Sequence, residues 1–375
     1  MSAGTHALEV TSIFEGVESQ KSPRLFVTLS ATAQVPASSM PPAAAASREL
    51  STSRSAICTS GSRSQECFEV LTIASGIGPV AALDSTPDGR LLMSTGDGRI
   101  LAVADRALLA DPVLTLPDPQ SRIVGLAVDT RFAESRTVFV AWTETARDKR
   151  TLLNITRYRA IGNTLGDAAT IAGGFSLAAD SLAPLAVDRE GLLYIALPRD
   201  AVAGFEGAQR APFGGAVLRV DRDGLTPIAN TRSSAVLSYG YAEPTLLAVD
   251  MTHGRIWLGG NSAPSEPLSS FGLRDGQAWP ILPARADLST LTNANPDAIA
   301  LAFDRAEGSA AALLRVNNQL FLAQSTPDAR LAPTGELPLP AGVPMAVANA
   351  PDGSWYVAAR SERGGTDILL LQRKR

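Results

Sequence analysis

The sequence predicts an all-β fold, a six-bladed β-propeller of four-stranded antiparallel blades, and three observations support this. Short apolar runs bounded by Gly, Pro and Asp follow one another from about residue 68 onward, long helical periodicity is nearly absent, and one strand–turn–strand unit recurs six times. Six units over residues 68–375 leave about 51 residues each, which four strands and their loops fill. A β-sandwich, the rival all-β fold, accounts less well for six regular units.

The repeated unit is an apolar strand, a turn with Asp, Asn or Gly, and a second apolar strand. Asp or Asn at the start of a turn can accept hydrogen bonds from the following backbone, and Gly tolerates positive φ. We therefore interpret Asp129, Asp188, Asp250 and Asp304 as turn-forming residues and not as metal ligands. The six copies are VAALDSTPDGRLLMST (80–95), GLAVDTRFAESRTVFVAWT (125–143), PLAVDREGLLYIAL (184–197), LLAVDMTHGRIWLGG (246–260), ALAFDRAEGSAAALLRV (300–316) and MAVANAPDGSWYVAAR (345–360).

Residues 1–67 are rich in Ala, Ser, Thr and Pro without periodicity, so we expect a flexible extension before a propeller at 68–375. No clear signal peptide is present, although the run 24–46 is interpretable as the remnant of an export signal or as a tether. Cys58 and Cys67 close a short loop and are a disulfide candidate in an exported protein, or two free thiols in a cytosolic one. A periplasmic or secreted location is the working hypothesis.

Composition narrows the classes of function. The chain of 375 residues has 33 basic and 37 acidic side chains without basic blocks, so nucleic acid is not the expected partner. No apolar stretch reaches the ~18 residues of a membrane-spanning helix. Two histidines, His6 and His253, exclude a multi-histidine metal centre, and His253 is expected to be an exposed turn residue. A small molecule, a sugar or a protein remains possible as a partner.

Four phrases of the propeller region resemble one known family in the right order. They are ASGIGPVAALDSTPDGRLLMSTGDGRILAV (74–103), GLAVDTRFAESRTVFVAWTE (125–144), GGAVLRVDRDGLTPIAN (214–230) and SYGYAEPTLLAVDMTHGRIWLGG (238–260). The family is that of the soluble quinoprotein sugar dehydrogenases, the glucose/sorbosone and aldose dehydrogenases that use pyrroloquinoline quinone (PQQ). The resemblance implies a six-bladed propeller, a histidine base, cations around the quinone carboxylates, and a supporting calcium ion.

The positions that carry this chemistry in the family have other residues here. Asp180 stands where the resemblance implies the histidine base, and a carboxylate there would need a raised pKa to act as a base. Tyr241, Glu243 and Asn261 occupy cavity positions implied by the resemblance, and Glu243 would repel an anionic cofactor. Glu266 is the one metal-ligand candidate. Arginines of the family pattern are replaced at Pro184, Ala242, Val343 and Met345.

Three functions stay open at this point. The first is a divergent glucose/sorbosone dehydrogenase-like propeller, a pseudoenzyme without the standard PQQ site that serves as a ligand-binding or scaffold domain. The second is an active PQQ-dependent aldose dehydrogenase with an altered site, for which PQQ and calcium are the implied cofactors. The third is a carboxylate-based hydrolase or lyase in which Asp180, Glu243 and Glu266 converge.

Overall fold

The fold was analysed in a computed structural model of the chain. The described residues are 54–61, 65–203, 213–228, 230, 234–261, 268–272, 284–285, 299–328, 330–340, 342–362 and 364–374, together with the backbone of 4–8, 13–14, 17–18 and 25–29.

The chain divides into two compact units, Met1–Glu49 and Leu50–Arg375. In the first unit, β1 (Gly4–Leu8) pairs with β4 (Leu25–Leu29), and β2 (Ile13–Phe14) pairs with β3 (Val17–Glu18). The second unit holds the propeller. The propeller begins before Phe68, because Arg54–Cys58, which we expected to belong to the flexible extension, form an outer strand paired with Cys67–Ile77.

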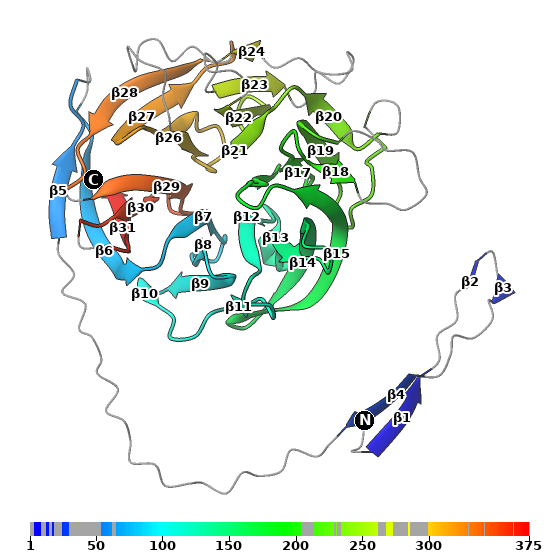
Figure 1. The fold of residues 1–375 in the computed structure, drawn as a ribbon. Coiled ribbons are helices and arrows are strands. Elements are labelled where there is room, and N and C mark those ends of the chain that lie inside the picture. The colour runs from blue at the N-terminus through cyan, green and yellow to red at the C-terminus, as the bar shows by residue number, and fades with distance from the viewer. Residues whose placement is uncertain are drawn as a thin grey trace, which may run out of the picture. The chain divides into compact units, whose positions relative to one another are not determined.

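Six antiparallel sheets form a ring of blades, which confirms the predicted six-bladed propeller (Figure 1). Blade 1 has β7 (Val80–Ser85), β8 (Leu91–Thr95), β9 (Arg99–Ala104), β10 (Ala107–Leu108) and β11 (Leu114–Thr115). Blade 2 has β12 (Arg122–Val128), β13 (Thr137–Thr145), β14 (Thr151–Ile161), β15 (Thr164–Leu177) and β18 (Val202–Ala203), with helix α1 (Phe132–Ser135) in its first turn. Blade 3 has β16 (Leu185–Val187), β17 (Leu193–Ala196), β19 (Ala216–Val220) and β20 (Val236–Tyr239).

The remaining three blades repeat the pattern. Blade 4 has β21 (Glu243–Asp250), β22 (Arg255–Asn261), β23 (Leu268–Gly272) and β24 (Ala284–Arg285). Blade 5 has β25 (Ile299–Phe303), β26 (Ala311–Val316), β27 (Gln319–Ser325) and β28 (Leu331–Leu337). Blade 6 has β29 (Val343–Asn349), β30 (Trp355–Arg360), β31 (Thr366–Arg373), β6 (Cys67–Ile77) and β5 (Arg54–Cys58).

The core lies between neighbouring blades, because each sheet is covered on both faces. In β30, Trp355 and Val357 pack toward blade 5, whereas Tyr356 and Ala358 pack toward blade 1. Burial of both faces explains why the strands are nearly continuous apolar runs and not alternating ones. The innermost strands β7, β12, β16, β21, β25 and β29 contact one another in ring order and surround the axis.

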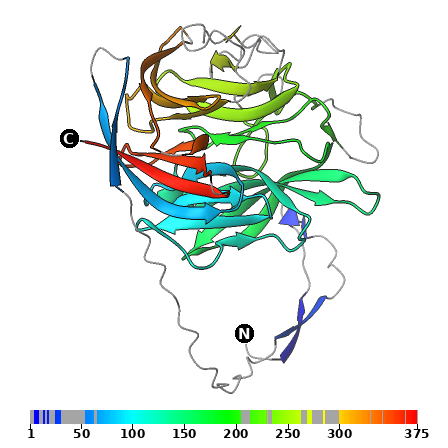
Figure 2. The same ribbon diagram turned by 60° about the vertical axis from the view of Figure 1, so that its left-hand side comes forward.

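The two ends of the propeller sequence close the ring. Strand β31, the last of the chain, pairs antiparallel with β6, and β5 adds to the outer edge (Figure 2). Cys58 and Cys67 stand opposite each other in the β5–β6 pair and are joined by a disulfide. Within the described residues, no helix is long and apolar enough to cross a membrane.

Candidate functional site

The central channel is narrow and is lined mainly by residues with apolar side chains, although more of its exposed surface is polar than apolar. Its cavity has a volume of about 110 Å³, well below the 300–1,000 Å³ of typical ligand sites. Leucine, valine and alanine side chains from the six innermost strands fill it. Among the described lining residues only Asp84 and Arg305 are charged, and the Arg305 guanidinium donates to the Asp84 carboxylate. The described residues of this channel therefore offer little room for a large anionic cofactor, and its one cation is already paired.

The channel has two chemically different ends. We call the turn end the side where each innermost strand leads into the second strand of its blade, and the loop end the side where the innermost strands begin. At the turn end, Asp129, Asp188, Asp250 and Asp304 each accept at least one backbone N–H two residues further on. Their predicted turn-forming role is confirmed.

Asp188 is bonded entirely within its hairpin through its side chain. It is buried, and its carboxylate accepts the backbone N–H groups of Glu190 and Leu192 and the hydroxyl of Tyr194, all within 2.9 Å. Burial raises the pKa of Asp188, and the three hydrogen bonds oppose that effect. All three bonds of the carboxylate lie within its own hairpin, so this carboxylate serves the turn.

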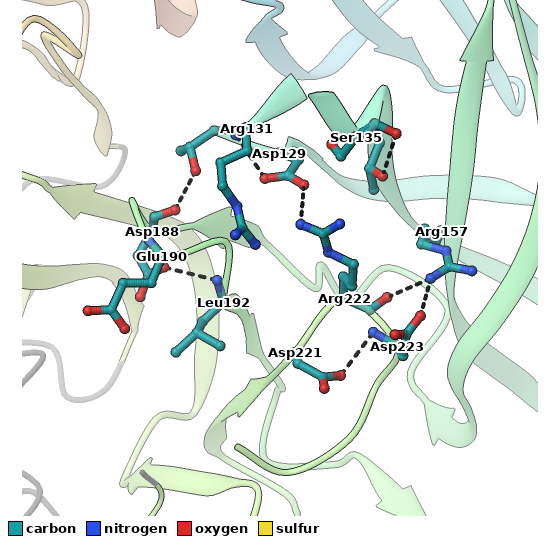
Figure 3. A network of polar contacts seen from close by, with 12 residues as sticks. Asp129, Arg131, Ser135, Arg157, Asp188, Glu190, Leu192, Asp221, Arg222 and Asp223 are labelled. Carbon is teal, nitrogen blue, oxygen red and sulfur yellow. Dashed lines mark hydrogen bonds and ion pairs between the residues drawn. The ribbon is translucent and has the colours of Figure 1, made fainter. Parts of the chain in front are cut away.

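A polar network joins blades 2 and 3 at the turn end (Figure 3). The Asp129 side chain is fully buried, and one of its oxygens lies 3.7 Å from Nη2 of Arg222 without a hydrogen bond. Arg157 of blade 2 pairs with Asp223 of blade 3. Each ion pair crosses from one blade to the next, so the network fixes the angle between two blades.

His253 also lies at the turn end, in the first turn of blade 4. Its side chain is 16% exposed, and Nδ1 lies 2.9 Å from an Asp250 oxygen and 3.0 Å from the hydroxyl of Ser325. The prediction of a turn residue is confirmed, but the prediction of an exposed side chain is wrong. Because Ser325 belongs to blade 5, the imidazole bridges two blades, a contact that no local sequence pattern reveals.

Asp180 lies at the loop end, between β15 and β16. Its side chain is 98% exposed and forms an ion pair with Arg122 at 3.0 Å. A general acid or base of a hydrolase works in a site that excludes water, which this position lacks. The structure thus places Asp180 at the loop end, in solvent.

The other predicted site residues divide into three groups. The Tyr241 side chain is buried in the core between blades 3 and 4, its hydroxyl lies 2.9 Å from that of Ser238, and burial raises its pKa to about 12. Glu243 is exposed at the start of β21, directly opposite Asn261 in the register. Glu266 lies outside the described residues. The structure brings Glu243 and Asn261 together and turns Tyr241 away from the channel.

Two arginines near the loop end were missed by the sequence reasoning. Arg315 of β26 is half-buried and donates to the backbone oxygens of Asn317 (2.7 Å) and Met345 (3.1 Å). Arg360 ends β30 and stands opposite Val343. Burial, with a smaller contribution from the charge of Arg360, lowers the pKa of Arg315. Val343 and Met345 are two of the positions where this chain lacks an arginine of the family pattern. Arg360 stands opposite Val343, and Arg315 donates to the backbone oxygen of Met345.

The described residues fit PQQ and calcium poorly. The described channel has a volume of only about 110 Å³, and Glu243 is an exposed carboxylate. The described part of the chain holds no cluster of three or more His, Cys, Asp or Glu able to bind a metal ion. An anionic cofactor next to Glu243 would be repelled. The Arg315 guanidinium already donates two hydrogen bonds to backbone oxygens. We therefore derive no reaction step through either group.

Comparison with known proteins identifies relatives of the fold. Residues 79–261 match the family model of glucose/sorbosone dehydrogenases. A putative oxidoreductase (glucose dehydrogenase) of Thermus thermophilus is 21% identical, covers 81% of this chain and 99% of its own, and has a TM-score of 0.60. The apo-form soluble aldose sugar dehydrogenase of Escherichia coli is 16% identical and has a TM-score of 0.61. The match covers 81% of this chain and 99% of that protein.

A third solved structure is the PQQ-bound aldose sugar dehydrogenase of Streptomyces coelicolor. It is 18% identical, covers 86% of this chain and 99% of its own, and has a TM-score of 0.57. At such identities the likeness concerns the fold alone. No curated protein sequence matches the chain.

Proposed function

Residues 79–261 belong to the glucose/sorbosone dehydrogenase family, and from this premise we propose that the chain is a divergent member without PQQ-dependent chemistry. In this proposal it serves as a ligand-binding or scaffold domain. The observation that carries it is the narrow channel, whose charged lining residues among those described, Asp84 and Arg305, are paired with each other. A quinone with several carboxylates needs free cations in a roomy cavity, and this channel supplies neither.

The positions carried over from the family support the same proposal. Asp180 replaces the expected histidine and is 98% exposed, and the Tyr241 hydroxyl is taken up by Ser238 in the core. The one histidine of the propeller, His253, lies at the turn end and is bound to Asp250. Proton transfer from a sugar hydroxyl needs a base at the reacting atom, and no described residue stands ready for it.

We further propose a periplasmic or secreted location. The Cys58–Cys67 disulfide supports it, because disulfides persist in oxidising compartments. Mass spectrometry of the protein from its natural source, with and without alkylation before reduction, tests this. Alkylation of both thiols without prior reduction would contradict it.

The main test is titration of the purified full chain with PQQ and Ca²⁺, followed by changes in the absorbance of the quinone. Dye reduction with a panel of aldoses is measured in parallel. We expect no stoichiometric binding and no turnover. Glu243→Gln is a matched variant that removes the exposed carboxylate without changing its size, and it should leave both results unchanged. Stoichiometric binding with sugar-dependent turnover in the unmodified chain would overturn the proposal.

Arg315 and Arg360 favour a second candidate, a dehydrogenase with an altered site. They place positive charge beside Val343 and Met345, the positions where this chain lacks arginines of the family pattern. If PQQ binds, the double variant Arg315→Met/Arg360→Met should weaken it at least tenfold, because charge-assisted hydrogen bonds of roughly 1.5–3 kcal/mol would be lost. Arg122→Met, whose partner is Asp180, is the control and should leave binding unchanged. Binding that the double variant leaves intact would exclude this candidate.

A further inference from the structure

A second hollow lies at the turn end, between blades 6, 1 and 2, and shares no described lining residue with the channel. Its volume is about 750 Å³, within the range of small-molecule sites. We call it the rim cleft. Its wall is formed by the turns after β7, β9 and β14 and by the parts of β30 and β31 nearest the turn end. Residues of three blades therefore line it.

One part of the rim cleft is fixed by charges that satisfy one another. The Asp88 carboxylate accepts from Arg90 at 2.9 Å and from Arg136 at 3.0 Å. Both guanidinium groups lie over the ring of Phe132, at 5.7 Å and 5.4 Å from its centroid. These contacts make a rigid wall that needs no further partner.

The other part carries polar groups without partners. Within the described part of the chain, the side chains of Asp105, Arg106, Asn163 and Gln372 form no hydrogen bond or ion pair, although all four line the cleft. The side chain of Tyr356 is only 6% exposed, and its hydroxyl also has no hydrogen-bond partner there. This hydroxyl is not one of the fully buried polar atoms without a partner, so it is open to the cleft and can bond a ligand there.

Backbone strain is concentrated at the same place. Asp105 and Arg106 are the two turn residues of the β9–β10 hairpin, with φ of 50° and 64°, and such turns favour Gly at the second position. Arg136, with φ of 54°, ends helix α1. Of the six described non-glycine residues with positive φ, these three line the rim cleft. Strain that clusters around a hollow is typical of functional sites.

We propose that the rim cleft binds a neutral polyhydroxylated molecule, a carbohydrate. Its lining balances three arginines (90, 106 and 136) against three aspartates (88, 105 and 352), so it favours a ligand of neither charge. The groups left open include carboxylate and amide acceptors and guanidinium, amide and phenol donors, and sugar hydroxyls both donate and accept. The proposal does not rest on the absence of PQQ chemistry, because the cleft and the channel have no lining residue in common.

The test is saturation-transfer NMR and calorimetry on the full chain with glucose, maltose and maltotriose, with glucuronate and glucosamine as charged analogues. Tyr356→Phe removes the hydroxyl that faces the cleft but keeps the ring. Arg106→Gly removes the guanidinium and also relieves the positive φ. Lys149→Gly is the control, because Lys149 has φ of 67° in a hairpin outside the cleft.

We expect a neutral sugar to bind more tightly than its charged analogues. Tyr356→Phe should raise its dissociation constant about threefold to tenfold, and Arg106→Gly by about tenfold or more. Arg106→Gly and Lys149→Gly should both raise the melting temperature by about 1–3 °C, while Lys149→Gly leaves binding unchanged.

Three results would overturn the proposal. One is that none of the neutral sugars binds at tens of millimolar. Another is that both cleft variants bind as the unmodified chain does, and the third is that glucuronate or glucosamine binds more tightly than glucose. Each of these would leave the PQQ titration untouched, so this inference and the proposed function fail separately.

Discussion

The turn end and the loop end of the channel are built from the same six strands, yet they differ in almost every respect. At the turn end each innermost strand runs into Asp or Asn, from Asp84 to Asn349, and most of these side chains are buried and hydrogen-bonded. At the loop end the acidic residues are exposed, with Asp180 almost entirely in solvent. The difference shows that the repeated sequence unit encodes a structural turn.

A loop-end glycine provides the sharpest way to break this comparison. A Cβ at Gly260 would lie 2.0 Å from the backbone oxygen of Glu243, and its φ is 140°. Gly260→Ala should therefore lower the free energy of unfolding by about 3–5 kcal/mol, measured by urea denaturation. Gly96→Ala, with open space and no positive φ, should change it by less than about 0.5 kcal/mol. Equal midpoints for the two variants would contradict the crowding at Gly260.

Two aspartates test the comparison directly. Asp188→Ala removes the acceptor of three hydrogen bonds from a buried turn and should cost about 3 kcal/mol. Asp180→Ala removes an exposed partner of Arg122 and should cost less than about 0.5 kcal/mol. Chemical denaturation of both variants gives the difference. A larger loss of unfolding free energy from Asp180→Ala than from Asp188→Ala would contradict the structural role assigned to the turn end.

One ion pair at the turn end links blade 5 to blade 1 beside the channel. Arg305→Met leaves the buried Asp84 carboxylate without its cation and the backbone oxygen of Ser85 without its donor. We expect a loss of about 1–2 kcal/mol in unfolding free energy. Arg122→Met, at the loop end, should be nearly neutral. If Arg305→Met unfolds at the same denaturant concentration as the unmodified chain, the pair does not hold the ring together.

The smallest predicted effect is a pH dependence that belongs to the turn end. Burial raises the pKa of Asp188 above its ordinary value of 3.8, so the folded chain holds this proton more tightly than the unfolded chain. The stability contributed by the proton is present below pH 3.8 and is lost as the pH rises through the folded pKa. The difference in stability between the unmodified chain and Asp188→Asn should fall as the pH rises through the folded pKa, measured by denaturation at several pH values. A rising difference would contradict it.

Much of the fold could be predicted because its signals are local. Each apolar run, its terminal Asp or Asn and the following Gly lie within about 16 residues, so six blades and their turn residues can be read from the chain. The burial of His253 could not be predicted, because Ser325 comes from the next blade. The cations beside Val343 and Met345 could not be predicted for the same reason. Arg360 stands opposite Val343 only because of the register between two strands, and Arg315 comes from the neighbouring blade.

The sequence by itself determined the six-fold repeat, the turn residues that end the innermost strands, and the absence of a histidine at the position implied by the family. The tertiary structure alone decided which side chains meet. It paired Arg305 with Asp84 across 221 positions of the chain and put Tyr356 of blade 6 into one hollow with Arg106 of blade 1. Closing a ring of blades brings the first and last thirds of the chain together, and such long-range contacts leave no periodic signal in a sequence.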